Sequence, residues 1–439
     1  MQKIIKLARN YFDSNYFIAI TYLFTILCWY LKDQRIAMIY YLLMTLLIIL
    51  LNARRASIIT LIFAAIINYR ETTFQSNMNI VLFMVAFGAP IILIDFFRRK
   101  VKLKNEIFIA MIILLLANIL SLINTTENTF HLGLVGVAQN IAFCALFLYF
   151  YNTNDKDINI YISKNALALG IAIALEFILY IITYQDDILG KDIELGWGIS
   201  NSIAMVLLLV IPLTIYLYSQ YQKHNFILFF VMIDILLVIL MLSKGAYLSL
   251  GLVFFPIFAF VFFFIKNRKK FIIDLIFSGL IFIVMLIFIF RFDILAIGIR
   301  EYMERMDGRG WFNDPARVKI YKYGFEVFKK YPILGAGSYS NGYNLVTGGF
   351  SEVIKHYHNY IIQTLATLGI VGLLSFGYYI FVIIKSCIKK NIYNILVLFA
   401  IIAMLIHGLV DNTWHNPIIM VIVTIYIVGV SKNKESSYD

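Results

Sequence analysis

The feature that most constrains this chain is a repetition of long apolar runs, separated by short breaks that are rich in charged residues, Asn, Gly or Pro. A helix needs about 20 mostly apolar residues to cross a bilayer. Fourteen such runs begin near residues 16, 36, 56, 79, 107, 132, 166, 199, 226, 246, 271, 359, 392 and 418. We therefore predict an all-α, polytopic transmembrane helix bundle of 12 to 14 spans, in which the shorter runs at 36, 56 and 418 are tilted or re-entrant.

Composition excludes several other classes of protein. Apolar residues make up 62% of the chain and charged residues only 14%, whereas an average soluble domain has roughly 45–50% and 25%. This balance excludes a disordered chain, a collagen-like fibre and a small disulfide scaffold. The three cysteines, Cys28, Cys144 and Cys387, have none of the spacings of zinc or redox motifs and imply no disulfide framework. No cofactor is expected.

The net charge of +12 is distributed in short clusters between the apolar runs, which argues against nucleic-acid binding. Most Lys and Arg fall in alternate breaks, including Arg54-Arg55, Arg98 to Lys104 and Lys266 to Lys270. Because basic residues favour the cytoplasmic side, both termini are predicted to be cytoplasmic. The first run, Tyr16 to Leu31, has no small-residue cleavage site, and we expect it to be retained as the first span.

One break is much longer than the others and divides the chain into three parts. Residues 291–358 are predicted to form an extracytoplasmic loop that carries short helices, between helices 1 to 11 in residues 1–290 and helices 12 to 14 in residues 359–439. Loops of this length usually have a function. Within it, Asn313 and Pro315 predict a helix start, Val318, Tyr321, Phe325 and Phe328 share one predicted face, and Tyr331-Pro332 ends the helix.

The order of motifs around this loop resembles a known family. Arg317 to Tyr321 is followed by Tyr331 to Gly337, and then by His358-Asn359 leading into Leu368 to Leu373. These segments resemble the signature of the O-antigen ligase and O-antigen polymerase family, which are bacterial integral-membrane polysaccharide glycosyltransferases. Two weaker similarities lie upstream, at Asn201 to Pro212 and at Leu242 to Gly245, where Lys244 stands in place of the more usual Arg.

The resemblance implies a metal-independent glycosyltransferase of the hexosyltransferase type in the bacterial inner membrane, with its active site on the extracytoplasmic face. Such enzymes take a glycan from an undecaprenyl diphosphate carrier. Polymerases pass it to another carrier-linked repeat unit, and ligases pass it to lipid A core. We prefer the O-antigen or capsule polymerase, because a repeat-unit polymer occurs in bacteria with or without lipopolysaccharide, and we keep the ligase as the alternative.

Three cations are candidates for the diphosphate. A leaving diphosphate needs fixed positive charge, and the planar, permanently charged fork of Arg provides it. Arg317 is the first candidate and is predicted to be catalytic. Lys244 and Arg309 are predicted to bind substrate from the same outer side.

The acceptor hydroxyl needs a base, and His358 at the outer mouth of a span is the candidate, with His356 ranked below it. Asn359 is expected to hold the imidazole ring or a sugar hydroxyl. Asp411 and His415, in the last outer turn, are candidates to line the acceptor site. The family motif adds Gly335 and Gly337 to the expected substrate-binding residues, and sugar stacking on Trp311, Tyr339 or Tyr343 is a weaker expectation.

Two other classes of function remain open. Glu176 and Asp234 lie inside apolar runs, where a charge is costly, and a lipid-linked glycan transporter or flippase would use such residues. A non-catalytic scaffold for polysaccharide export would not depend on Arg317 or His358. The expected partners are the carrier-linked oligosaccharide donor, a carrier-linked or lipid A core acceptor, the bilayer and other polysaccharide assembly proteins.

Overall fold

The computed structural model describes residues 2–65, 94, 97, 101–153, 157–183, 193–291, 315–351, 354–388, 391–414 and 416–435. In these ranges the chain is almost wholly helical, and its strands are one short antiparallel pair, β1 (Glu194–Leu195) and β2 (Gly198–Ile199). The helices are α1 (Gln2–Phe12), α2 (Asn15–Leu31), α3 (Gln34–Leu50), η1 (Arg54–Ala56), α4 (Ser57–Ala65), α6 (Glu106–Ser121), η2 (Leu122–Asn124), α7 (Glu127–Tyr151), α8 (Ile158–Thr183), α9 (Ser200–Gln220), α10 (Phe226–Leu240), α11 (Lys244–Phe264), α12 (Arg268–Arg291), α14 (Pro315–Lys330), α15 (Asn341–Thr347), α16 (Tyr360–Cys387), α17 (Ile392–Gly408) and α18 (Pro417–Glu435).

Asn side chains in the polar breaks help to set where helices begin. Asn105, Asn359 and Asn391 precede α6, α16 and α17, and each accepts a hydrogen bond from a backbone N–H of the following first turn. Such capping satisfies donors that have no partner within the helix. Each break therefore stops one apolar run and starts the next.

The predicted runs coincide with helices throughout the described ranges, and the run near residue 79 lies outside them. Seven of the described helices are long and apolar enough to cross a membrane, or up to eight if the bent pair of α1 and α2 is one span. The helices α10, α17 and most of α3 and α18 are apolar but shorter. The all-α membrane architecture is thus observed, and the count of 12 to 14 spans stays a prediction.

Burial distinguishes a central span from peripheral ones. Of the apolar window of α9, 89% is buried, whereas only 17% of that of α12 is buried. An apolar helix that is buried all round belongs in the interior of a bundle, and one that leaves apolar side chains exposed is suited to lipid. Helices α8, α10 and α17 pack around α9.

Loops that are distant in sequence meet at one end of the bundle. The Asn124 Nδ2 atom, at the end of η2, donates to the Gly335 carbonyl oxygen (2.9 Å), and Asn416 Nδ2 donates to Ser202 Oγ at the start of α9 (3.2 Å). We call this end of the bundle the loop end. All of these segments were predicted to lie on the same side of the membrane.

At the opposite end of the bundle, loops that are distant in sequence also meet. Lys102 N–H donates to Asn152 Oδ1 (2.7 Å), and Lys432 Nζ donates to Thr153 Oγ1 (2.9 Å). Helix α7 begins at the loop end and finishes at this second end. The breaks are thus grouped into two sets, as a strict alternation of spans requires.

Helix α16 is interrupted at Gly369, which has φ +66° and ψ −162°. The segment from Pro332 to Gly337 lies in this break and is joined to it by main-chain hydrogen bonds alone. Ala336 N and Gly337 N donate to the carbonyl oxygens of Ala366 and Thr367, while Ile370 N and Val371 N donate to those of Pro332 and Ile333. We call this arrangement the seam.

The apolar residues that share a predicted face of α14 are not the ones that the helix buries. The helix ends before Tyr331-Pro332 as predicted, but its buried residues are Ile320, Gly324 and Val327. Val318 and Phe325 are 40% and 46% exposed. Gly324 packs against Ile362 and Tyr357, so a small residue decides which face meets α16.

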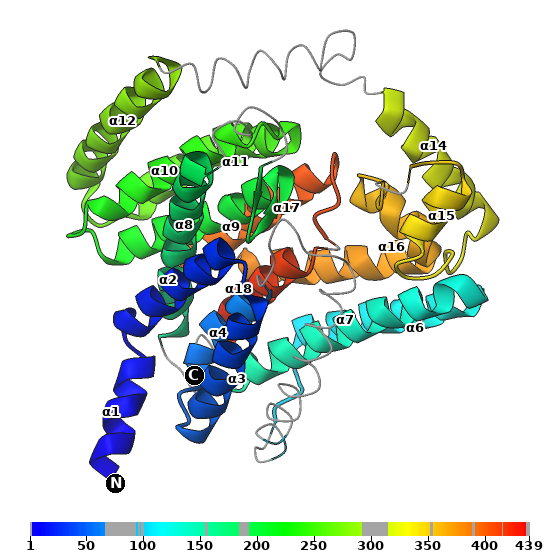
Figure 1. Cartoon of the computed structure of the whole chain (residues 1–439), viewed down its shortest axis with the longest axis horizontal. Coiled ribbons are helices and arrows are strands. Elements are labelled where there is room, and N and C mark those ends of the chain that lie inside the picture. Colours follow the sequence, from blue (N-terminus) through cyan, green and yellow to red (C-terminus); the bar gives the residue numbers. More distant parts are fainter. Residues whose placement is uncertain are drawn as a thin grey trace.

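Figure 1 shows the helices that surround α16. Helices α6 and α7 lie side by side next to α16, and the short helices α14 and α15 cover its beginning. The predicted helix over Asp293 to Met306, together with Arg309, Trp311 and Asn313, lies outside the described residues.

Candidate active site

The centre of the candidate site is a pair formed by His358 and Asp411. His358 Nδ1 lies 3.2 Å from Asp411 Oδ1, and the two side chains are 31% and 19% exposed. His358 precedes α16, whereas Asp411 belongs to the loop between α17 and α18, residues 409–416. When Nδ1–H donates to the carboxylate, Nε2 keeps its lone pair and suits a general base.

The backbone of His358 is held in an uncommon conformation. Its φ is +51°, which non-glycine residues rarely adopt. Tyr321 on α14 donates its hydroxyl to the His358 carbonyl oxygen (3.0 Å). Helix α14 therefore supports the position of the imidazole, and strain of this kind is concentrated at functional sites.

Asp411 is kept ionised by its surroundings. Burial raises the pKa of this carboxyl, but the hydrogen bond with His358, the positive charges that His407 and His358 bring and the N–H of Asn412 outweigh it. The pKa of Asp411 is consequently held well below its usual range. A permanent carboxylate stabilises an imidazolium that forms on His358.

Arg317 reaches the same loop from α14. Its Nη1 donates to the carbonyl oxygen of Val410 (2.6 Å), next to Asp411, and its side chain is half-buried. The structure thus brings together the two residues that were predicted to be catalytic. A guanidinium carries five N–H donors in a planar fork, and this geometry suits an anion such as a diphosphate.

Lys244 begins α11, and the first turn of that helix packs against the same region. Ser243 Oγ lies 3.2 Å from His407 Nε2. A Cβ on Gly245 would approach Val410 Cγ2 to 2.6 Å, which shows how close the two backbones are. The backbone of Lys244 therefore adjoins the loop that Arg317 and His358 contact.

His407 was missed by the sequence analysis. It is buried at the end of α17, 1% exposed, and joins the start of α11 to the region around Asp411. The signal in the sequence was a single His interrupting an apolar run directly before Gly408.

Asn359 joins the start of α16 to the loop of the site. Its Oδ1 caps α16, and its Nδ2 donates to the Leu409 carbonyl oxygen (2.8 Å). Asn359 therefore fastens the beginning of α16 to the loop of residues 409–416. Its amide is used by these contacts, so its predicted role with a sugar hydroxyl stays a prediction.

His356 also contacts this loop. Its Nδ1 accepts hydrogen bonds from the amides of Asn341 and Asn412, each at 3.1 Å. Burial, together with the positive charges of His358 and Lys355 and against the opposing effect of Asp411, lowers the pKa of His356 from 6.5 to about 4. His356 is thus a neutral acceptor at neutral pH.

Gly335 and Gly337 lie in the seam. Both have positive φ, +69° and +107°. A Cβ on Gly335 would overlap the backbone of Thr367 and Leu368, and one on Gly337 would collide with Thr125. These contacts give both glycines a packing role, and contact with substrate stays a prediction.

The remaining candidates lie elsewhere. Arg309 and His415 are outside the described residues. Glu176 accepts a hydrogen bond from Gly196 N between β1 and β2 (3.1 Å), and Asp234 packs against Gly170 of α8. These contacts give Glu176 and Asp234 structural partners in α8, α10 and the hairpin. In the described part of the chain, no three His, Cys, Asp or Glu side chains are grouped as a metal site requires.

The fold and site define a polytopic helical membrane protein with a histidine–aspartate pair and an arginine on one loop. Residues 226–377 match the family model described as O-Antigen ligase. The match confirms the predicted resemblance to the O-antigen ligase and polymerase family over this part of the chain, from α10 to α16. It contains Lys244, Arg317 and His358, and it ends before Asp411. No curated protein matches the chain.

The matched segment and the apolar helices together support a membrane enzyme of the O-antigen ligase and polymerase type, acting in polysaccharide assembly. The match spans the seam and the start of α16 but leaves out α17 and α18. Half of the histidine–aspartate pair therefore comes from outside the matched segment.

Proposed function

We propose that this protein is a bacterial inner-membrane glycosyltransferase that moves a glycan from an undecaprenyl diphosphate carrier to a hydroxyl acceptor during surface polysaccharide assembly. The observation that carries the proposal is the meeting of two segments on one loop, with His358 on Asp411 and Arg317 on Val410. A general base and a diphosphate-binding cation are the two groups that such a transfer requires.

His358 activates the acceptor hydroxyl. Its Nε2 takes the proton of the acceptor hydroxyl as the oxygen forms a bond to the anomeric carbon of the donor. Asp411, bonded to Nδ1, stabilises the imidazolium that results. Attack on the face opposite the leaving group inverts the anomeric carbon.

The cations Arg317 and Lys244 bind the diphosphate of the donor. As the bond between the anomeric carbon and the diphosphate oxygen breaks, its electron pair stays on the diphosphate, where Arg317 offers a bidentate fork. Lys244, at the start of α11 beside the same loop, adds a point charge. Arg309 is a third candidate for this role, and His415 is a candidate for the acceptor side.

We prefer the polymerase, in which the acceptor is a second carrier-linked repeat unit. The ligase, in which the acceptor is lipid A core, is the alternative that the description of the matched family favours. The site faces the extracytoplasmic side, because Lys244, Arg317, His358 and Asp411 lie at the loop end, whereas the basic Arg54-Arg55 and Lys266 to Lys270 breaks belong to the other set of loops.

Reconstituted transfer tests the function. Purified protein in proteoliposomes receives an undecaprenyl-diphosphate-linked repeat unit alone, and then with lipid A core, and products are separated on a gel. A ladder from the donor alone identifies a polymerase, and one shifted band that needs the core identifies a ligase.

The matched variants are His358→Ala and His224→Ala. We expect His358→Ala to lower the initial rate by about 10²–10⁴-fold, the usual contribution of a general base. His224 is exposed at the opposite end, so its replacement should leave the rate unchanged. Full activity of folded His358→Ala would overturn the mechanism, and no product from wild type with its natural donor would favour a transporter that uses Glu176 and Asp234.

A further inference from the structure

The face of α14 that points away from α16 is exposed and mixed in character. Val318, Lys322, Phe325 and Lys329 follow one another at helical spacing, and all four side chains are exposed. Two apolar and two basic residues thus share one stripe, on the side of the helix opposite its buried residues. The proposed transfer reaction uses none of these four side chains.

The exposed face of α14 is also positively charged. The helix carries four exposed lysines, which are Lys319, Lys322, Lys329 and Lys330, and its acidic residue is Glu326. Lys329 Nζ lies 5.2 Å from the centroid of the Phe325 ring, and this ring lies 5.7 Å from that of Phe328. Aromatic rings next to ammonium groups complement a surface that offers both apolar and anionic groups.

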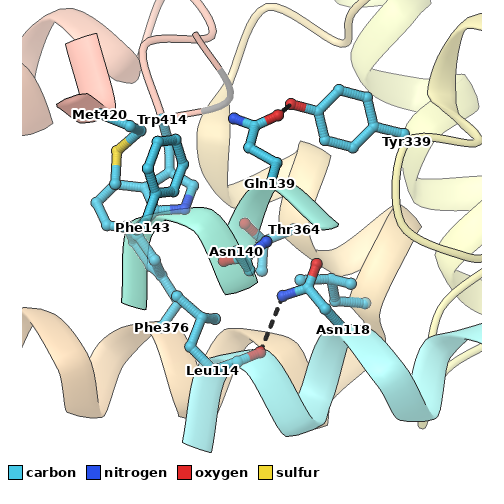
Figure 2. A pocket seen from close by; sticks show the side chains of 11 residues that line it. Leu114, Asn118, Gln139, Asn140, Phe143, Tyr339, Thr364, Phe376, Trp414 and Met420 are labelled. Carbon is cyan, nitrogen blue, oxygen red and sulfur yellow. Dashed lines mark hydrogen bonds between the residues drawn. The ribbon is translucent and has the colours of Figure 1, made fainter. Parts of the chain in front are cut away.

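Helix α16 has an exposed stripe of its own, which is apolar and aromatic. Ile370, Leu374, Tyr378 and Phe381 recur at helical spacing and are all exposed. The opposite face of α16 is packed inside the bundle, and Figure 2 shows Phe376 among side chains of α6 and α7. A span that is covered on one face and apolar on the other is suited to lipid on its open face.

The length of this stripe gives the level of the bilayer. At the second end of the bundle, Lys385 Nζ lies 3.6 Å from Glu106 Oε2, and such an exposed charged pair marks the edge of the hydrocarbon. Ile370 lies about 22 Å from Lys385 along the axis of α16. A hydrocarbon layer of about 30 Å therefore extends about 8 Å past Ile370 toward the loop end.

Helix α14 lies at that edge. Gly324 packs against Ile362, and beyond the end of α14 the Pro332 carbonyl oxygen accepts from Ile370 N (2.9 Å). The helix thus runs beside the first turns of α16, as Figure 1 also shows. The edge of the hydrocarbon falls between these two contacts, at the level of Phe325.

We propose that the exposed face of α14 is a contact with the membrane surface, in which Phe325 enters the apolar edge of the bilayer and Lys322, Lys329 and Lys330 bind the phosphate groups of anionic phospholipids. Amphipathic helices with lysines and aromatic residues bind lipid surfaces in this way. The inference does not rest on the proposed function, because no glycan takes part in the contact.

The contact has a consequence for the candidate site. Helix α14 also carries Arg317 and Tyr321, which donate to the carbonyl oxygens of Val410 and His358. A helix that is fixed on the lipid surface therefore holds both of these donors at a constant depth in the membrane.

The collision accessibility of a nitroxide tests this contact locally and without substrate. A variant that lacks the three native cysteines is labelled at Phe325→Cys and reconstituted in vesicles of phosphatidylcholine, alone or mixed equally with phosphatidylglycerol. Oxygen concentrates in lipid, so we expect it to relax the label more than a neutral, water-soluble nickel complex does. Access of the nickel complex should fall about fivefold further with phosphatidylglycerol, the effect of one lysine at an anionic surface.

Matched variants separate the apolar and the charged parts of the contact. Leu374→Cys on the lipid stripe and Asn128→Cys at the loop end, both exposed, give the two extremes of accessibility. Replacement of Lys322, Lys329 and Lys330 together by Gln should abolish the effect of phosphatidylglycerol on the label at Phe325→Cys, whereas replacement of the same three by Arg should retain it. Salt at about 1 M, which screens charges beyond about 3 Å, should act as the Gln variant does.

Three outcomes would overturn the proposal. Nickel access at Phe325→Cys equal to that at Asn128→Cys in both kinds of vesicle would exclude a membrane contact. A label that oxygen reaches but phosphatidylglycerol does not affect, or equal behaviour of the Gln and Arg variants, would exclude binding of anionic headgroups. A response that appears only when undecaprenyl phosphate is added to phosphatidylcholine would assign this face to the carrier lipid instead.

Discussion

Arg317 and His358 reach adjacent residues of one loop, Val410 and Asp411. In sequence, Arg317, His358 and the loop lie in three separate segments, and each contact alone is an ordinary one. Together they put a guanidinium and an imidazole on two adjacent residues of a single loop. The spacing of these groups is therefore controlled by the loop of residues 409–416.

Replacement of Arg317 by Lys is expected to be costly although the charge is retained. Lys loses the planar fork that contacts Val410 and a diphosphate together, so transfer at limiting donor should fall about tenfold or more. Lys319→Arg on the same helix is the matched swap, because Lys319 lies over the Phe350 ring and away from the loop. Rates equal to wild type for Arg317→Lys in proteoliposomes would argue against diphosphate binding.

His356 makes stability depend on pH. An unfolded chain takes up a proton as the pH falls below 6.5, whereas the folded chain does so only near pH 4. The folded state should therefore lose about 1–2 kcal/mol between pH 7 and pH 5, seen as a lower apparent Tm in detergent. The contribution of Asp411, whose pKa is lowered, is lost only below the ordinary carboxyl value of 3.8, outside this window.

His356→Gln is the control for this effect, because an amide keeps polar contacts but does not titrate. Its apparent Tm should change less between pH 7 and pH 5 than that of wild type. An equal decrease in both proteins would show that other groups control the pH dependence.

The sequence singled out residues of the candidate site but not the contacts between them. His358, Arg317 and Asp411 were singled out by residue type and position, since each chemistry is tied to a side chain. Their meeting on one loop depends on how α14, α16 and α17 pack, which no local pattern contains. His407 was missed for the same reason, because a buried His in an apolar run resembles a structural residue.

Helix α16 shows what local patterns miss at the scale of one element. The apolar run from residue 359 predicted its span, but the break at Gly369 was not foreseen, because a glycine within an apolar helix is common. The break exists only because Pro332 to Gly337 supplies replacement hydrogen bonds. The buried face of α14 was not foreseen for a similar reason, since Gly324 allows close approach that periodicity does not reveal.

Gly369→Ala tests the seam. The backbone there has φ +66°, and a Cβ would lie 2.6 Å from Gly335 N and closer still to Ile333, so we expect a loss of more than about 2 kcal/mol and a poor yield of folded protein. Gly377→Ala on the same helix has open space around it and should be neutral or stabilising by up to about 1 kcal/mol. Equal thermal stability of the two variants would contradict the role of the seam.

At the scale of the whole molecule, the alternation of charged breaks predicted which loops lie together. The contacts of the described loops agree with this grouping, and the side of the membrane on which each set lies stays a prediction. Spans alternate because lipid allows few ways to satisfy a backbone other than continuous helices. Burial could not be predicted from hydropathy, because α9 and α12 are both strongly apolar and yet one is central and the other peripheral.

Thiol labelling tests the orientation. In a variant without Cys28, Cys144 and Cys387, we expect Asn128→Cys to react with a membrane-impermeant maleimide on intact spheroplasts, and Lys266→Cys to react only after permeabilisation. Both positions are exposed at opposite ends of the bundle. The reverse pattern would place the site on the cytoplasmic side, and labelling of both from outside would contradict the alternation.

The seam has a consequence for how such a protein can vary. All four of its hydrogen bonds join main-chain atoms, so the side chains of Ile333, Leu334 and Ala336 are not needed for the bonds themselves. The seam can therefore keep its hydrogen bonds, and His358 its place beside Asp411, when the exposed side chain of Ile333 is exchanged for one that suits a different glycan. At Gly335, Gly337 and Gly369 a methyl group would collide with neighbouring atoms, so the seam requires glycine at these three positions.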